Sequence, residues 1–394
     1  MIMNLKNVRY RFEKYDRAIV AAAWLLSIVL YLLLFGIGTN LEAGKYIEEA
    51  HRFIDNGAFY APRYWFYSTT LFIMIVSFKL GIGTTGAFIL QAILNFLAYQ
   101  LFYKALVKLF RQKVIPLFII FYLLAFWPFQ GWVVFLYTES AFFSTILILF
   151  SSVILMDPRQ LKSLFLIGLC LLWVIVSRPL GILFSGGVYT YLFVRANKQW
   201  KWITGAGAVL VAIAGYFTIN AIYGSIADWT ITQAFEQESI ICDLPSPGPY
   251  AVLDLDKSGS PVYQLFYYLT HNPSHFLRFA SVKLEYFFLM TRPYYSKGHN
   301  LFLLLNAVTL YLLCIAGIFS KRKFLVKGMM AFILVTLLLF TLTILFQCDD
   351  YHNRFIGAIF PLLAVLAAKG ILSLLHFFKD KKKTAGISIE SPVQ

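Results

Sequence analysis

Long apolar stretches separated by short polar segments run along most of the chain. Ten of them come close to the roughly 17–25 residues that cross a bilayer. They lie at about 18–38, 85–103, 115–135, 140–156, 163–177, 180–194, 202–223, 300–319, 328–346 and 355–377. The pattern therefore predicts an all-α polytopic membrane protein with about 10 transmembrane helices.

One further apolar segment, residues 64–82, allows two interpretations. As an eleventh span it would place the basic residues at 104–113 outside the membrane. As a helix lying at the outer interface, which its Trp and Tyr content suits, it leaves every basic cluster on the inner side. We favour the interfacial helix and keep eleven spans as the alternative.

Composition and charge narrow the class of protein. Of the 394 residues, 60% are hydrophobic and 13% are charged, against about 45–50% and about 25% in soluble domains. This excludes a soluble enzyme with a single membrane anchor, a disordered chain and a fibrous protein. The net charge of +15 does not indicate nucleic-acid binding, because the basic residues gather in short segments between apolar stretches. Those segments are 6–17, 104–113, 159–162, 195–201, 321–327 and 379–383. Such clusters mark cytoplasmic loops, so both termini are expected in the cytoplasm.

This topology gives one membrane domain over residues 1–394 with two long outer loops. The first loop, 39–84, carries the interfacial helix, and the second, 224–299, becomes amphipathic over about 261–290. Residues 379–394 form a basic cytoplasmic tail. Most acidic residues fall on the outer side, so we expect the functional site on that face.

The four cysteines indicate no metal site. They form no CxxC pair and no Cys/His ligand spacing, so neither zinc nor a disulfide framework is predicted. Cys242 and Cys348 lie in polar stretches, and they can pair only if both loops face an oxidising compartment.

Two acidic residues at predicted outer helix ends are candidate catalytic groups. Glu42 follows the first span, and on a helix Glu42, Tyr46 and Ala50 share one face. The alternative is a helix whose acids only face water. Glu139, after Tyr137, opens an otherwise apolar helix. It is either a charge favoured by the helix dipole or a functional group at membrane depth.

Basic residues at the same face are candidates for binding phosphate. An arginine at a helix end offers a planar fork of donors to two phosphate oxygens. The alternative is contact with ordinary lipid headgroups, but Arg178 and Arg354 each stand in charge-poor helix ends. The outer-face set is Arg63, Arg178, Arg292, Lys297, His299 and Arg354.

Several motifs, taken in order, resemble the GT-C superfamily of polytopic glycosyltransferases, which use dolichyl-phosphate-mannose and similar polyprenyl-phosphate sugars. Glu42–Tyr46–Ala50 resembles the D/E-x-x-x-Y-x-x-x-A start of the first outer loop in that superfamily. Further resemblances are Gly57–Pro62 with the helix after it, Tyr137–Phe142, Ser177–Gly181 and Arg354–Leu363. Two positions depart from the family pattern: Glu42 stands where Asp is usual, and Ala358 replaces the first proline of the late motif.

The resemblance implies transfer of a sugar from a polyprenyl-phosphate carrier to a glycan, lipid or protein acceptor. In this family the reaction takes place at the outer face of the bacterial inner membrane or in the ER lumen. We expect Glu42 to be the general base, Glu139 to orient the acceptor or hold a metal, and Tyr46 to position the sugar or carrier. Tyr137 is a further candidate for substrate binding. With one base, the reaction inverts the configuration at the sugar carbon.

Other functions remain open at this stage. A transporter or flippase of lipid-linked sugars would use the same cations without a base. A polymerase or ligase of surface polysaccharide would depend on Arg292 or Arg354 and not on Glu42. No cofactor is required by the sequence, although a divalent ion, Mg²⁺ or Mn²⁺, at Asp349, Asp350 and His352 is an alternative.

Overall fold

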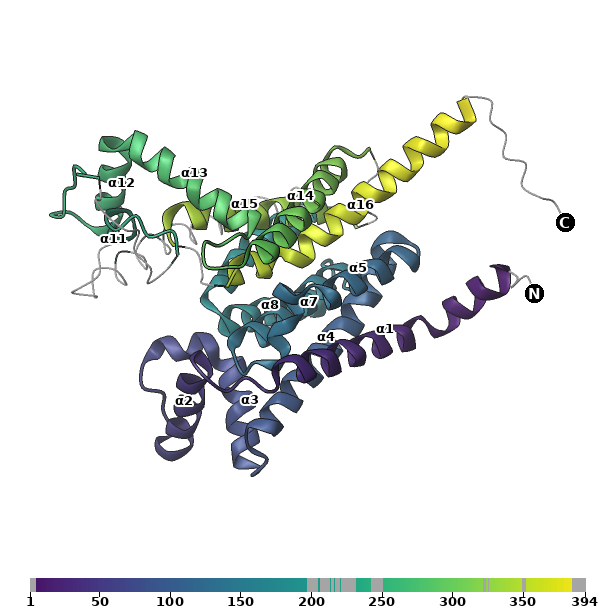
Figure 1. Cartoon of the computed structure of the whole chain (residues 1–394), viewed down its shortest axis with the longest axis horizontal. Coiled ribbons are helices and arrows are strands. Elements are labelled where there is room, and N and C mark those ends of the chain that lie inside the picture. The colour runs from purple at the N-terminus through teal and green to yellow at the C-terminus, as the bar shows by residue number, and fades with distance from the viewer. Residues whose placement is uncertain are drawn as a thin grey trace. The chain divides into compact units, whose positions relative to one another are not determined.

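The computed structural model describes residues 5–196, 205, 213, 216, 220, 232–241, 251–321, 324, 326–348 and 352–384. The chain divides into two compact units. Unit 1 comprises residues 1–182, 306–329 and 357–394, and unit 2 comprises 183–305 and 330–356. Every regular element of the described residues is a helix (Figure 1).

Unit 1 is built around α7 (Thr138–Leu155), which is buried over almost its whole length. It packs against α4 (Gly83–Phe110) and α8 (Leu161–Ser177). A helix that is apolar on every side is expected at the centre of such a bundle. The other elements are α1 (Leu5–Phe35), α2 (Glu42–Asn56), η1 (Pro62–Tyr67), α3 (Ser68–Lys79), α5 (Val114–Ala125), α6 (Trp127–Gln130), η2 (Gly131–Val134) and η3 (Pro179–Leu183).

Unit 2 contains the amphipathic part of the second predicted loop. There α12 (Pro261–His271) and α13 (Pro273–Leu289) pack together with α11 (Gln233–Glu236) on a small apolar core (Figure 1). The predicted break near 272 is confirmed, because α13 begins at Pro273. The remaining helices are α9 (Phe184–Arg195), α14 (Lys297–Phe319), α15 (Met329–Phe346) and α16 (Arg354–Thr384), of which the last three include residues of both units.

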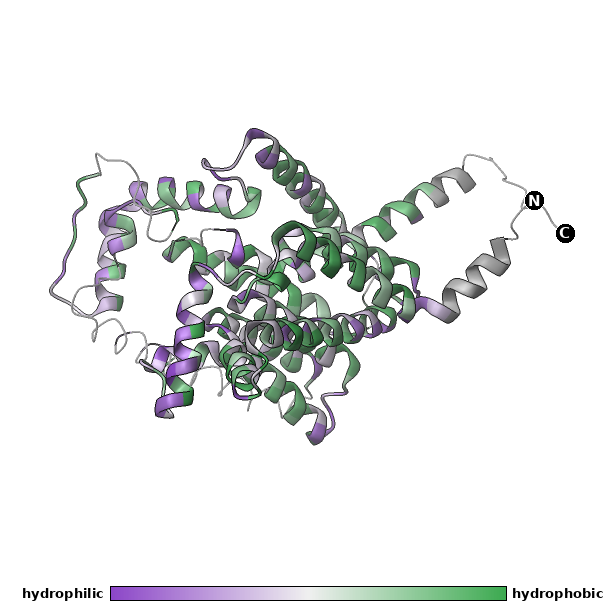
Figure 2. Cartoon of the chain, turned by 60° about the horizontal axis from the view of Figure 1, so that its bottom comes forward, coloured by the Kyte–Doolittle hydropathy of each residue, from purple (hydrophilic) through white to green (hydrophobic). Residues whose placement is uncertain are grey.

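Six described helices are long and apolar enough to cross a membrane, which confirms a polytopic membrane protein. Hydrophobic residues predominate along the long helices (Figure 2). The six candidate membrane-spanning helices are Tyr15–Phe35 of α1, the whole of α4, α7, α14 and α15, and Arg354–Phe378 of α16.

Three of the remaining predicted spans take other forms, and the count of about 10 stays a prediction. The predicted span 115–135 is a broken one, with 71° between Val114–Ala125 and Trp127–Val134. Helix α8 is a shorter apolar helix, and 180–194 divides into η3 and α9. The span predicted at 202–223 lies outside the continuously described residues.

The segment 64–82 is not one continuous helix. It divides between η1 and α3, and α3 has 12 residues. At about 1.5 Å per residue it reaches roughly 18 Å, short of the ~30 Å hydrocarbon core. Helix α3 alone is therefore too short to cross, and it lies beside α2 in unit 1 (Figure 1).

Candidate functional site

A backbone clip in unit 1 holds together the segments that precede the two candidate acids. The amide of Gly38 donates to the Val134 carbonyl at 2.9 Å, and the amide of Leu136 donates to the Gly38 carbonyl at 2.9 Å. A side chain at Gly38 would collide with the ring of Phe135. The amide group of Gln91 adds bonds to the carbonyls of Val133 at 3.0 Å and Phe135 at 2.9 Å. The chain before α2 is thus fixed to the chain before α7.

Glu42 is the first residue of α2, which is a separate helix and not a continuation of the first span. Helix α1 ends at Phe35, and Gly36 follows with φ of 66°, a left-handed conformation that glycine adopts easily. The hydroxyl of Tyr46 donates to the Glu42 carboxylate at 2.9 Å, and Lys45 Nζ lies 3.1 Å from the same oxygen. The Glu42 side chain is 21% exposed, so water can reach it.

Glu139 has the opposite environment. It is the second residue of α7, its side chain is fully buried, and the Arg178 guanidinium forms an ion pair with it. Arg178 directly follows the last residue of α8. A buried carboxylate is stable only with such a partner. The structure therefore brings together two residues that the sequence analysis treated separately, and Arg178 binds a carboxylate within the protein.

Two tyrosines connect these acids into one group. The rings of Tyr46 and Tyr67 lie 5.6 Å apart between centroids. Burial raises the pKa of each phenol, so both remain protonated donors at neutral pH. Glu42, Glu139 and Arg178 all act electrostatically on both phenols. We call these five residues the acid–tyrosine cluster.

Tyr67 was not predicted as a site residue. Its place in an aromatic run, Tyr64–Tyr67, made it look like part of an interfacial helix. Pro62 is the feature of the sequence that could have identified Tyr67 as a site residue. It begins the short helix η1, and Tyr67 is the last residue of that helix.

Two other predicted residues of unit 1 lie beside the cluster. The Tyr137 hydroxyl donates to the Asn40 carbonyl at 3.2 Å and so reinforces the clip. Arg63 is exposed, its guanidinium lies 5.5 Å from the Tyr64 ring, and its charge acts on Tyr67. Tyr137 therefore positions backbone, whereas Arg63 is a cation available at the surface.

The other predicted cations belong to unit 2. Arg292 is 1% exposed, and its Nη1 donates to the carbonyls of Tyr286 at 2.7 Å and Thr291 at 3.0 Å. It therefore braces the turn between α13 and α14. Lys297 at the start of α14 is exposed, and His299 packs edge-on against Tyr295 with 4.6 Å between ring centroids.

Arg354 is buried at the first position of α16. Its neighbour Asn353 has φ of 60° and donates to the Met290 carbonyl at 2.7 Å, which ties the start of α16 to the end of α13. The sequence analysis grouped Arg354 with the acids, but it belongs to unit 2 and they belong to unit 1.

The described residues contain no group of three His, Cys, Asp or Glu side chains placed to hold a metal ion. Asp349 and Asp350, which were considered as ligands, lie outside the described residues, while His352 is exposed. Cys348 is disulfide-bonded, whereas Cys170 and Cys314 are free thiols. Cys242, which could pair with Cys348 only if both loops face an oxidising compartment, is outside the residues that the structure describes.

Comparisons with protein family models, curated proteins and solved structures find no match to this chain. A functional proposal therefore depends on the acid–tyrosine cluster and on the motifs in the sequence.

Proposed function

We propose that this chain is an integral-membrane glycosyltransferase of GT-C type. It moves a sugar from a polyprenyl-phosphate carrier to an acceptor at the outer face of a bacterial inner membrane, with inversion. The observation that carries the proposal is the contrast between the two acids. Glu42 is partly exposed and held by Tyr46, whereas Glu139 is buried and paired with Arg178.

Glu42 has the properties of a general base. A base must be reachable by the proton it accepts and must be held in place. The Tyr46 hydroxyl and the Lys45 ammonium both contact one carboxylate oxygen of Glu42. These contacts fix its direction, and the partial exposure leaves it accessible.

Glu139 serves a different purpose because of its environment. It is fully buried and its charge is balanced by Arg178, so it is a poor acceptor for a substrate proton. It positions the Arg178 guanidinium beside Tyr46 and Tyr67. Two carboxylates in contrasting environments commonly divide the roles of acid–base chemistry and positioning in this way.

In the proposed reaction the acceptor oxygen attacks the anomeric carbon on the face opposite the phosphate. The bond from carbon to the phosphate oxygen breaks, and polyprenyl phosphate leaves with the electron pair. Glu42 takes the proton of the acceptor hydroxyl. A phosphate leaving group needs cations and not a protonated acid, and the exposed Arg63 is the candidate in unit 1.

Two observations support an outer-face site. The basic clusters follow the pattern of cytoplasmic loops. The disulfide at Cys348 suits an oxidising compartment, as disulfides are rare in the cytosol.

Transfer of radiolabelled sugar from polyprenyl-phosphate donors tests the proposal in membranes that contain the full chain. We expect Glu42→Gln to lower kcat/KM by about 10²–10⁴-fold, the usual contribution of a general base. Glu48→Gln on the exposed face of α2 is the matched control and should leave transfer unchanged.

Three outcomes would contradict the proposal. Full activity of Glu42→Gln, or a product with retained configuration, excludes this mechanism. Donor binding without release of polyprenyl phosphate, insensitive to Glu42, favours a flippase or transporter. Activity that requires Arg292 or Arg354 but not Glu42 favours a polymerase or ligase.

A further inference from the structure

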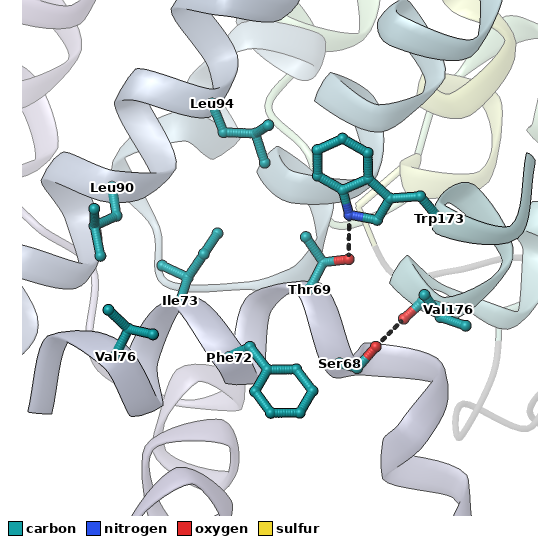
Figure 3. Close-up of a pocket in the computed structure, with 9 residues that line it drawn as sticks. All are labelled: Ser68, Thr69, Phe72, Ile73, Val76, Leu90, Leu94, Trp173 and Val176. Carbon is teal, nitrogen blue, oxygen red and sulfur yellow. Dashed lines mark hydrogen bonds between the residues drawn. The ribbon is translucent and has the colours of Figure 1, made fainter. Parts of the chain in front are cut away.

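An apolar groove lies between three helices of unit 1. Its walls include Ile73 and Val76 of α3, Leu90 and Leu94 of α4 and Trp173 of α8, which surround a common opening in Figure 3. Its volume is about 540 Å³, within the roughly 300–1,000 Å³ of ordinary ligand sites. Among the described residues, no charged side chain lines it. We call it the α3–α4–α8 groove.

One end of the groove is polar. The Trp173 indole donates to the Thr69 hydroxyl at 3.1 Å, and that hydroxyl lies 2.7 Å from the Ser177 hydroxyl. Next to it, the Ser68 hydroxyl donates to the Val176 carbonyl at 3.1 Å (Figure 3). A ligand is therefore offered hydrocarbon along the groove and neutral hydroxyl groups at this end.

Along the chain, this polar end adjoins two members of the acid–tyrosine cluster. Tyr67 immediately precedes Ser68, and its ring lies 5.6 Å from that of Tyr46, whose hydroxyl bonds to Glu42. On the other wall, Ser177 immediately precedes Arg178. The groove and Glu42 thus belong to one unit. They are linked through the neighbouring residues Tyr67 and Ser68 and through the contacts of Tyr46.

We propose that the α3–α4–α8 groove binds a hydrocarbon chain of the acceptor, so that the acceptor is a membrane lipid with a neutral, hydroxyl-bearing head group. The inference rests on the proposed function, because it takes Glu42 as the base. A general base lies within hydrogen-bond reach of the hydroxyl that it deprotonates. The substrate bound beside Glu42 is therefore the acceptor.

The charges near the groove favour this occupant over a phosphate-bearing lipid. A donor carrier or a phospholipid brings an anionic phosphate, which needs cationic partners. No residue that lines the groove in the described part of the chain is cationic. Arg178, which directly follows Ser177 at the polar end, forms an ion pair with Glu139. Neutral sugar or glycerol hydroxyls match the hydroxyl-lined end.

Photo-crosslinking of the purified full chain in vesicles of phosphatidylethanolamine and phosphatidylglycerol tests the occupant. The probe is a monoglucosyl diacylglycerol with a diazirine in one acyl chain. Parallel samples contain undecaprenyl phosphate or phosphatidylethanolamine with the same diazirine. We expect the glycolipid to label peptides from α3, α4 and α8, and unlabelled glycolipid to compete. Labelling should persist in Glu42→Gln, since binding does not require the base.

Other labelling patterns overturn the inference. Preferential labelling by undecaprenyl phosphate assigns the groove to the donor. Equal labelling by all three probes, without competition, means an adventitious lipid only.

Variants that fill the groove give a second, kinetic test. In Ile73→Trp, and independently Leu94→Trp on the neighbouring helix, we expect kcat/KM for the long-chain glycolipid to fall roughly tenfold or more. Transfer to a water-soluble glucoside of the same head group should be unchanged. Leu33→Trp on α1, where Leu33 is 79% exposed, is the matched control. An equal loss for both acceptors contradicts the inference.

The two proposals fail differently. Absence of transfer, or transfer independent of Glu42, removes the glycosyltransferase while groove labelling can persist. Normal Glu42-dependent transfer with an unlabelled groove removes only the lipid acceptor.

Discussion

The Glu139–Arg178 pair is the most constrained contact of the acid–tyrosine cluster. Because the carboxylate is fully buried, removing the arginine leaves its charge without this ion pair. We expect Arg178→Gln to destabilise the protein by about 3–5 kcal/mol, as for other broken buried pairs. Thermal unfolding of the detergent-purified protein measures this loss.

The double variant Glu139→Gln with Arg178→Gln provides the control for that prediction. It removes both charges, so much of the stability should return. Transfer activity should remain low if the pair positions substrate groups. A single variant as stable as wild type would show that the ion pair contributes little.

Lys283 of α13 provides a prediction about pH. Its ammonium lies 4.5 Å from the Phe235 ring centroid and 4.3 Å from that of Phe279, and burial lowers its pKa to about 7. In the unfolded chain the pKa of this lysine stays near 10.4. Between about pH 7 and pH 10 the unfolded chain therefore binds more protons than the folded chain. The free energy of unfolding therefore rises with pH between about pH 7 and pH 10. Below pH 7 the lysine is charged in both states, and the full penalty for burying its charge remains.

Lys283→Met should accordingly stabilise the α11–α13 core, with a gain that is greatest below pH 7 and vanishes above about pH 10. Limited proteolysis of residues 232–289 in the intact protein across this range measures the effect. Lys257→Met, at an exposed ion pair in the same region, is the control. A gain that grows with pH would mean that the lysine is stabilised in its charged form.

At the scale of elements, the clip between the chain before α2 and the chain before α7 sets the distance between the acids. In Gln91→Leu the carbonyls of Val133 and Phe135 lose a common donor, at about 1–3 kcal/mol for a buried group left unbonded. We expect kcat to fall more than KM changes, because the acids are displaced while the groove is intact. Gln100→Leu on the same helix is the control, and the two variants should differ in transfer assays.

The sequence predicted individual helices well because length and apolarity decide them locally. Glu139 was placed correctly at a helix start, whereas Glu42, expected just after the first span, begins a separate helix. The break in the predicted span 115–135 also had a local signal, since Pro128 stands at the first turn of α6 and prevents a continuous helix.

Contacts between distant residues could not be predicted in the same way. Arg178 and Glu139 are 39 positions apart, and Gln91 reaches Phe135 over 44. No periodicity encodes such a pairing, because it depends on how α4, α7 and α8 pack. Glu139 and Arg178 were therefore predicted only as separate site residues. Neither the role of Gln91 nor the groove was predicted.

At the scale of the whole molecule, the orientation in the membrane decides which compartment the site faces. The disulfide of Cys348 makes this measurable, because the other described cysteines, Cys170 and Cys314, are free and can be replaced by alanine. In that background we expect a membrane-impermeant maleimide to label intact cells only after treatment with an impermeant reductant. An added cysteine at Lys104→Cys, in a basic cluster predicted to be cytoplasmic, should react only after permeabilisation.

The opposite pattern would reverse the topology. If the Cys348 thiol reacts only after permeabilisation, the loop after α15 does not face an oxidising compartment. The positive-inside assignment would then be wrong for this chain. A site on the cytoplasmic side would meet nucleotide-activated sugars in solution, so the need for a lipid-phosphate donor would disappear with it. The labelling experiment thus tests the donor class as well as the orientation.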